Sequence, residues 1–361
     1  MFNNVIKPLI IQKIERVSNT KINTLIISFS LFLLMVRELF TNFETITKVT
    51  FNSQALKLFK FQYEKNSIYR SYCDLINVNP CDVNEINKIP FLPIQFFKTH
   101  DLNFDKSPPQ IKFESSRTTG QTPSIHNVND LNLYIKSFNK AFSHFYGNIE
   151  DYVILALLPS YLERDNSSLV FMADYLIKKT KRVESGFYLD NWHSLKKRLI
   201  TLESKSQKTI LLGVTFALLE GAEKFIWNLK NTIIMETGGM KGMRKELVRS
   251  ALHKKLKDRY KVTEIHSEYG MTELLSQAYS KGKGIFKCPP WVKVMSRSIE
   301  DPFEILTPRK IGALNIIDMA NIDSCAFIAT QDLGKVDFDG SFEVLGRFDQ
   351  SEIRGCNLMV I

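Results

Sequence analysis

Between residues 152 and 256, short apolar segments alternate with segments of helical periodicity. The apolar segments lie at 152–159, in the first part of 209–225 and at 231–239, and the helical ones lie at 168–179, in the second part of 209–225 and at 245–256. A strand that is followed by a helix returns parallel to its neighbour, because parallel strands need a long crossover connection. The alternation therefore predicts an α/β fold with a mostly parallel sheet flanked by helices.

The segments on either side of this region predict further elements. Helical spacing is present at 54–69 and at 130–146, whereas 89–102 is interrupted by prolines and has the Ile and Phe content of a strand. After residue 286 the pattern changes to short strands separated by Gly and Pro turns, which predicts a β-rich subdomain over 286–361. The expected strands are WVKVMS, GALNIID, CAFIAT, GKVDF and SFEVLGR.

The composition is that of a globular protein with 361 residues, 44% of them hydrophobic and 24% charged. The net charge of +10 would suit a polyanionic ligand such as ATP. The basic residues are scattered over amphipathic segments rather than clustered, which disfavours nucleic-acid binding. Five cysteines without CxxC spacing indicate neither a disulfide framework nor a zinc site, and a reducing cytoplasm fits best.

The N-terminus carries a continuous apolar run at residues 22–36, INTLIISFSLFLLMV. It is short for a spanning helix, which needs roughly 20 residues, and no cleavage site of a signal peptide follows it. Residues 1–34 are therefore either a membrane anchor or an extension upstream of a natural start at Met35. The second interpretation is favoured, and the domain is then expected over 35–361. Membrane association is expected only if residues 22–36 form a true anchor.

A Ser/Thr-rich loop, FESSRTTGQTPS, occupies residues 113–124. Short hydroxyl side chains and a conformationally flexible glycine are typical of a phosphate-binding loop. The same composition is common in ordinary loops, so this segment indicates a phosphate site only together with other motifs. Those motifs are METGGMKG at 235–242, HSEYGMTE at 266–273, and the pair TQDLGKV and EVLGRFDQSEIRG at 330–336 and 343–355.

In this order and spacing, the four segments resemble the adenylate-forming superfamily, which activates carboxylic acids as acyl-AMP. The stretches GVTFALLEGAE, EYGMTELLSQAY and LGRFDQSEIRGCNLMV are similar, more narrowly, to the acyl-protein synthetases of bacterial bioluminescence. The resemblance covers roughly 43–361 and implies the N-terminal domain of an adenylate-forming enzyme, without the large C-terminal domain of most members. It also implies ATP and Mg²⁺ as cofactors and a carboxylic acid, expected to be a long-chain fatty acid, as substrate.

The resemblance assigns a role to each motif residue. Thr272 would contact the α-phosphate and Glu273 would bind Mg²⁺, a hard cation that prefers carboxylate oxygen. Tyr269 would face adenine, and Asp332 would accept hydrogen bonds from the ribose hydroxyls, with Arg347 as a second ribose or phosphate contact. The expected ATP-binding residues are Ser115, Ser116, Thr118, Thr119, Gly120, Gly238, Gly239, Tyr269, Gly270, Asp332 and Arg347.

Cys356 is the expected acyl acceptor within the chain. In the acyl-protein synthetases, as the resemblance implies, an enzyme cysteine takes the acyl group as a thioester and passes it to a partner such as an acyl-reductase. Cys356 lies between Gly355 and Asn357, and the neighbouring Arg354 would favour its thiolate. Cys325, within the apolar CAFIAT, is expected in the core.

Two positions depart from the family pattern. Relatives carry glycine where this chain has Arg117 and usually lysine where it has Ile125. A non-glycine residue in a left-handed conformation costs roughly 1–2 kcal/mol, and the lost lysine removes a cation. Both changes weaken ATP binding, so two functions stay open: an active ATP-dependent acyl-protein synthetase, or a catalytically weakened relative that binds a nucleotide or a partner.

We predict that residues 1–34 are dispensable for folding and activity, because the motif-bearing region begins beyond them. A chain that begins at Met35 should be as soluble and as active as the full-length protein. Insoluble or inactive shortened protein, beside a well-behaved full-length chain, would instead favour a true anchor.

Overall fold

The computed structural model describes residue 37 and residues 40–104, 107–116, 122–158, 166–188, 191–238 and 248–347. The chain divides into two units, Met1–Phe43 and Glu44–Ile361. The first unit is described only at residue 37 and at 40–43, and the architecture below is that of the second unit. The described residues contain no helix that is long and apolar enough to cross a membrane.

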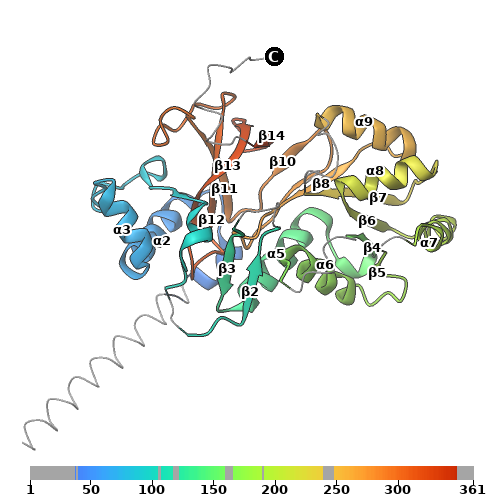
Figure 1. The fold of residues 1–361 in the computed structure, drawn as a ribbon, viewed down its shortest axis with the longest axis horizontal. Coiled ribbons are helices and arrows are strands. Elements are labelled where there is room, and N and C mark those ends of the chain that lie inside the picture. Colours follow the sequence, from blue (N-terminus) through green and yellow to red (C-terminus); the bar gives the residue numbers. More distant parts are fainter. Residues whose placement is uncertain are drawn as a thin grey trace, which may run out of the picture. The chain divides into compact units, whose positions relative to one another are not determined.

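A parallel sheet forms one half of the second unit, as the alternating pattern predicts. Its strands follow the order β5-β4-β6-β7-β8, and all neighbours are parallel. Figure 1 shows α5 and α6 beside one face of this sheet and α8 and α9 beside the other. Every residue of β4 and β6 is buried, because both faces of these strands are covered. The strands are β4 (Val153–Leu157), β5 (Gly186–Phe187), β6 (Thr209–Val214), β7 (Thr232–Thr237) and β8 (His266–Tyr269).

The helices of this half begin where their sequences supply a cap. Asp130 accepts a hydrogen bond from Asn132 N at the start of α5, and Gly147 ends that helix with a φ of 82°. Ser167 and Asn191 cap α6 and α7 in the same way. The helices are α5 (Leu131–Tyr146), α6 (Ser168–Lys179), α7 (Trp192–Ser204), α8 (Thr215–Lys224) and α9 (Arg249–Tyr260).

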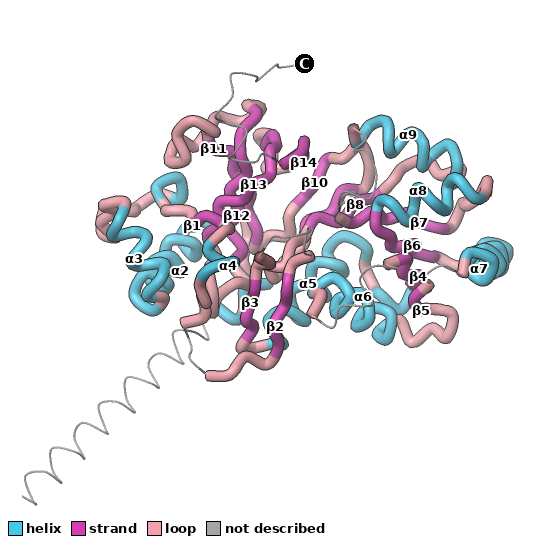
Figure 2. Tube along the Cα trace, in the orientation of Figure 1, coloured by secondary structure: helices cyan, strands magenta, loops and turns pink. Residues whose placement is uncertain are grey.

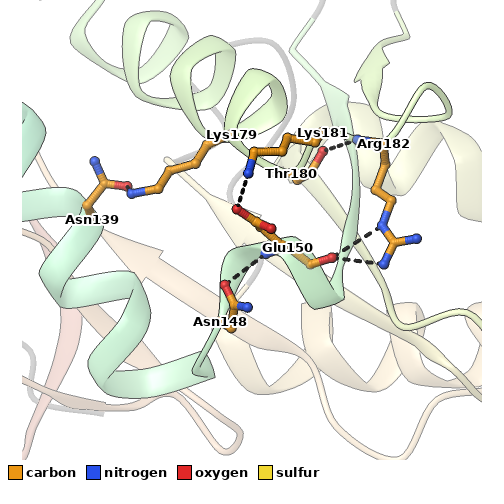
Figure 3. Close-up of polar contacts among 7 residues, drawn as sticks. All are labelled: Asn139, Asn148, Glu150, Lys179, Thr180, Lys181 and Arg182. Atoms are coloured by element: carbon orange, nitrogen blue, oxygen red, sulfur yellow. Dashed lines mark hydrogen bonds and ion pairs between the residues drawn. The ribbon is translucent and has the colours of Figure 1, made fainter.

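A short polar cluster fixes the turn that leads from α6 to β5. Glu150, in η3 (Ile149–Asp151), accepts a hydrogen bond from Lys181 Nζ at 2.7 Å, and its backbone carbonyl accepts two from Arg182 (Figure 3). Lys181 has a φ of 55°, so the turn requires the left-handed conformation there. Because Glu150 neutralises part of this basic turn, the cluster has an evident structural role.

Antiparallel strands form the other half and continue the same sheet. From β8 the order runs through β9, β10, β14, β13 and β12 to β11, and each of these pairs is antiparallel. Figure 2 shows β11, β12 and β13 together, with α2 and α3 beside them. The strands are β9 (Ala278–Ser280), β10 (Ile285–Lys287), β11 (Val292–Arg297), β12 (Ile311–Asp318), β13 (Phe327–Val336) and β14 (Phe342–Arg347).

The N-terminal helices pack on this antiparallel half through aromatic rings and buried amides. The ring of Phe59 lies edge-on to Phe327 at 6.3 Å, and Tyr69 stacks on the same ring at 6.0 Å. The Gln62 side chain donates to the carbonyl oxygens of Asn321 and Ile322. The remaining elements are η1 (Phe43–Thr45), α2 (Phe51–Lys65), α3 (Ser67–Leu75), η2 (Ile86–Lys88), β1 (Leu92–Pro93), α4 (Phe96–Thr99), β2 (Ile111–Glu114) and β3 (Ile125–Val128).

The prediction of a strand over 89–102 was largely wrong. Only Leu92–Pro93 is β-structure, paired with β13, and the helical turn α4 follows at Phe96–Thr99. CAFIAT and GKVDF, predicted as two strands, form the single strand β13 with a bulge near Leu333. A bulge lets one strand bend without ending, and the sequence signal for it resembles that for a turn. Cys325 is fully buried, as predicted.

Candidate functional site

The motif segments converge on the ends of β7 and β8. Gly238 directly follows β7, and the YGMTE segment begins in the last residue of β8 and continues into a turn. Because β7 and β8 are parallel, both segments leave the sheet at the same edge. Gly238 has a φ of 65°, a conformation that favours glycine, and its carbonyl oxygen accepts a hydrogen bond of 2.9 Å from Thr215 Oγ1.

A buried contact between a glutamate and a histidine involves the strand that leads to Gly238. Glu236 in β7 places Oε2 at 2.7 Å from His253 Nε2 of α9, and its other oxygen accepts from Thr215 Oγ1 at 3.5 Å. Glu236 and His253 are both buried. Thr215 therefore links this pair to the glycine turn, a connection that the sequence analysis missed.

Tyr269, Asp332 and Arg347 form one polar group at this edge. The Tyr269 hydroxyl donates to Asp332 Oδ2 at 2.7 Å, and Arg347 Nε lies 3.5 Å from Asp332 Oδ1. Asp332 and Arg347 are direct cross-strand partners on β13 and β14. Burial raises the pKa of Asp332, whereas the hydrogen bond from Tyr269 and the charges of Arg347 and Arg249 lower it. The Tyr269 ring contacts Phe286 and Phe342.

Glu273 lies near this group and near the predicted phosphate loop. It is 6% exposed, and burial raises the pKa of its carboxyl. A side-chain hydrogen bond with Ser124 and the charge of Arg347 lower that pKa, while the charge of Asp332 raises it. Residues from three of the predicted segments, at 113–124, 266–273 and 330–355, are therefore brought together.

The predicted phosphate loop connects β2 and β3, which pair as a hairpin. Its neck is closed by Ser115 and Ser124: Ser115 N donates to Ser124 O at 3.0 Å, and Ser124 N donates to Ser115 Oγ at 2.9 Å. Ser116 is half-buried, and Ile125, where relatives carry lysine, is 39% exposed. Arg117, Thr118, Thr119, Gly120, Gly239 and Cys356 lie outside the described residues.

Two anchors hold the turn that carries Thr272 and Glu273. His126 Nδ1 lies 2.8 Å from the carbonyl oxygen of Thr272, and Asn321 Nδ2 donates to that of Glu273 at 2.8 Å. Burial lowers the pKa of His126 to about 4, so its ring is neutral near neutral pH. Neither residue could be predicted from the sequence, because single polar residues in apolar segments form no recurring pattern.

Asp318, at the end of β12, is a third anchor. Its carboxylate accepts hydrogen bonds from Leu275 N and Ser276 N, both at 2.9 Å, and from Ser276 Oγ at 2.6 Å. Burial raises the pKa of Asp318, and these hydrogen bonds lower it. The carboxylate thus holds the segment that directly follows the turn, and this role was also missed.

Glu268 is a buried carboxyl between the two motif strands. It accepts a hydrogen bond from the Thr237 hydroxyl of β7, and it lines a small cavity whose other walls are mainly apolar side chains of α5, α6 and the sheet. Burial raises the pKa of Glu268 to about 7. A Cβ on Gly270 would lie 2.5 Å from Glu268 Oε1, so the glycine of YGMTE leaves room for this carboxyl.

The described residues contain no cluster of three or more His, Cys, Asp or Glu side chains that could hold a metal ion by themselves. Glu273 nevertheless fits a Mg²⁺ site, because Mg²⁺ in nucleotide sites is commonly held by one or two carboxylates together with substrate phosphates. Its carboxyl is buried next to Ser124, at the neck of the predicted phosphate loop.

Comparison with known proteins bears on these residues. Residues 10–153 match the family described as acyl-protein synthetase, LuxE. The match confirms the resemblance to acyl-protein synthetases over those residues, which include the Ser/Thr-rich loop. None of the curated proteins matches the chain.

The fold is that of the adenylate-forming enzymes. The chain superposes on a 2-hydroxyisobutyryl-CoA ligase, crystallised with 2-HIB-AMP and CoA, with a TM-score of 0.57 and 10% identity, over 84% of this chain and 72% of the ligase. An ATP-bound RpMatB-BxBclM chimera gives a TM-score of 0.50 and 17% identity, and ATP-bound MatB from Rhodopseudomonas palustris gives 0.48 and 16%. Each of the latter two superpositions includes 67% of this chain and 49% of the other structure, so the chain spans about half the length of those two proteins.

Glu268 predicts a pH dependence of stability. Its folded pKa of about 7 lies above the usual 4.5, so its contribution to stability is complete below pH 4.5 and is lost as the pH rises through 7. Glu268→Gln keeps an acceptor for Thr237 but does not ionise. As the pH rises from 4.5 to 8, the unfolding free energy of the variant should increase by about 3 kcal/mol relative to that of the native protein.

Urea denaturation at several pH values measures this difference. Glu300→Gln is the matched control, because Glu300 is exposed and its replacement should leave the pH dependence unchanged. Parallel pH profiles for the native protein and Glu268→Gln would show that Glu268 ionises normally.

Proposed function

We propose that this protein uses ATP to activate a carboxylic acid and then transfers the acyl group to a cysteine thioester and on to an acceptor protein. One observation carries the proposal: residues from three motif segments gather at one edge of the sheet, namely Ser124, Tyr269, Glu273, Asp332 and Arg347. The family match over residues 10–153 and the acyl-adenylate bound to the 2-hydroxyisobutyryl-CoA ligase of the same fold support it.

In the first step a carboxylate oxygen of the acid attacks the α-phosphorus of ATP. The bond between the α-phosphorus and the bridging oxygen breaks, and pyrophosphate leaves with the electron pair. Such a step depends on in-line positioning and on stabilisation of developing charge. Thr272 would contact the α-phosphate, and Ser115, Ser116 and the loop that follows them would hold the β- and γ-phosphates.

The ribose would bind at Asp332. A carboxylate offers about four acceptor positions, and Tyr269 and Arg347 occupy only part of this capacity. The remaining positions can accept the ribose hydroxyls. The Tyr269 ring, fixed by its hydroxyl and by Phe286 and Phe342, would border the adenine together with the turn at Gly238.

Mg²⁺, bound at Glu273, would neutralise phosphate charge when ATP is present. The burial of Glu273 suits this role, because a buried carboxylate without a counter-charge is costly and gains most from a cation. The charge of Arg347 already favours the ionised form of Glu273.

In the second step the Cys356 thiolate would attack the carbonyl carbon of the acyl-adenylate, and AMP would leave. We infer a fatty acid as substrate and an acyl-reductase or similar protein as the final acceptor from the resemblance to acyl-protein synthetases. The alternative is a catalytically weakened relative, favoured by Arg117 and by the exposed apolar side chain of Ile125 where relatives carry lysine.

Glu273→Gln should abolish Mg²⁺-dependent exchange of labelled pyrophosphate into ATP, because the amide keeps the shape of the side chain but removes the ligand charge. The exchange is measured with a panel of carboxylic acids, and circular dichroism checks the fold. Unchanged exchange in the variant would remove Glu273 from the site. No exchange by the native protein with any acid, together with exchange by the Arg117→Gly, Ile125→Lys double variant, would establish the weakened relative.

Cys356→Ser should separate the two steps. Labelled acid and ATP should leave the native protein with label that survives denaturation and is released by neutral hydroxylamine, as a thioester is. The variant should lose this label and keep pyrophosphate exchange, because adenylation needs only the nucleotide site and the acid. Cys325→Ser is the matched control, and label that persists in Cys356→Ser would exclude Cys356 as the acceptor.

A further inference from the structure

A circuit of buried polar side-chain contacts holds the turn that carries Thr272 and Glu273. His126 Nδ1 contacts Thr272 O at 2.8 Å, and His126 Nε2 lies 3.0 Å from Ser324 Oγ. Ser324 Oγ donates to Asn321 Oδ1 at 2.7 Å, and Asn321 Nδ2 donates to Glu273 O at 2.8 Å. The circuit therefore begins and ends on the backbone of the two residues that the proposed function places at the phosphates and the metal.

The side chains of this circuit are buried. The exposed fractions of His126, Asn321 and Ser324 are 2%, 1% and 3%. Further contacts fix them: the Phe97 ring of α4 lies edge-on to the imidazole at 5.3 Å, and Asn66 donates to the carbonyl oxygen of Ser324 at 2.8 Å. A buried hydrogen bond is costly to break when water cannot replace the partner, about 1–3 kcal/mol for each group left unpaired.

The two ring nitrogens of His126 are not equivalent. The carbonyl oxygen of Thr272 can only accept, so Nδ1 must carry the proton. Ser324 has one hydroxyl proton and two neighbouring acceptors, His126 Nε2 and Asn321 Oδ1. The bond at Nδ1 is therefore obligatory, whereas the Ser324 proton has an alternative acceptor and the bond at Nε2 is exchangeable.

His126 also belongs to the hairpin that carries the Ser/Thr-rich loop. It lies on β3, opposite Phe113 of β2 and two residues after Ser124, which closes the loop neck with Ser115. One imidazole thus joins this hairpin to a turn 146 positions away in the sequence.

We propose that His126 is a positioning residue of the nucleotide site, whose Nδ1–H bond to Thr272 sets the neck of the hairpin loop, at Ser115 and Ser124, against Glu273. This inference rests on the proposed function, in which the loop holds the phosphates and Glu273 holds their metal ion. The geometry matters because displacements of about 1 Å in such a site can cost on the order of 100-fold in rate.

Asparagine and glutamine at position 126 distinguish the two nitrogens. Asparagine carries an N–H donor near the position of Nδ1, whereas glutamine carries its amide near that of Nε2. His126→Asn should therefore retain the bond to Thr272, and His126→Gln should lose it. Ser324→Ala removes the partner of Nε2 and the donor to Asn321 Oδ1 but leaves the bond at Nδ1 in place, and it is the control within the circuit.

The first measurement is the Mg²⁺ concentration at half-maximal pyrophosphate exchange in the full-length protein. Loss of a residue that holds a metal ligand in place typically lowers metal affinity 10–100-fold. The half-maximal Mg²⁺ concentration should therefore rise about tenfold or more in His126→Gln. It should stay within about threefold of the native value in His126→Asn and Ser324→Ala. A smaller folded fraction lowers the amount of exchange but leaves this concentration unchanged, so the measurement separates positioning from stability.

The second measurement is hydrogen–deuterium exchange of residues 270–276 without ATP or Mg²⁺. The amides of this segment should exchange faster in His126→Gln and at the native rate in His126→Asn. If the native protein shows no pyrophosphate exchange with any acid, the proposed function fails and this measurement alone decides the role of His126. Equal behaviour of the two variants, in either measurement, would overturn the inference.

Discussion

The turn between β8 and β9 is held in place mainly by side chains from elsewhere in the fold. Leu274 N donates to Met271 O within the turn, whereas the carbonyl oxygens of Thr272 and Glu273 are held by His126 and Asn321. Asp318 then fixes the two amides that follow. Because these partners are buried, the turn cannot shift without leaving several polar groups unpaired.

These anchors come from the antiparallel half of the large sheet and from the separate β2–β3 hairpin. Asp318 ends β12 and Asn321 follows it, whereas His126 lies on the β2–β3 hairpin. The turn therefore lies where the parallel strands, the antiparallel strands and the hairpin meet. A site at this junction receives residues from each of them, which is why Asp332 and Ser124 both affect the pKa of Glu273 although they are distant from it in sequence.

The electrostatics of the junction favour a polyanion with its cation. Glu273 is buried and Asp332 is half-buried; burial raises the pKa of both carboxyls, and the charge of Asp332 raises that of Glu273 further. Arg347, 72% exposed, stands on the solvent side, and the charges of Arg347 and Arg249 both act on Asp332. The arrangement leaves Glu273 suited to a metal ion and leaves Arg347 accessible to a phosphate or ribose.

Elements with local signals could be predicted from the amino-acid sequence alone. Periodicity located α5, α6 and the strands β4, β6 and β7, and Asp130 marked the start of α5, because a helix cap and a buried strand depend on adjacent residues. It was insufficient for α4 and for the continuous β13, where a proline and a bulge mimic turn signals. The motifs also located the glycine turn and the YGMTE segment at the ends of their strands.

Only the tertiary structure decided which polar residues support the site. His126, Asn321, Ser324 and Asp318 are single polar side chains without a recurring pattern, and their partners lie up to 198 positions away. Their importance arises from burial: a polar group inside the fold must find a partner, and which partner it finds depends on how distant strands are brought together. Adjacent residues determine where a strand or a helix cap forms. No short segment of the sequence specifies which distant strands come into contact.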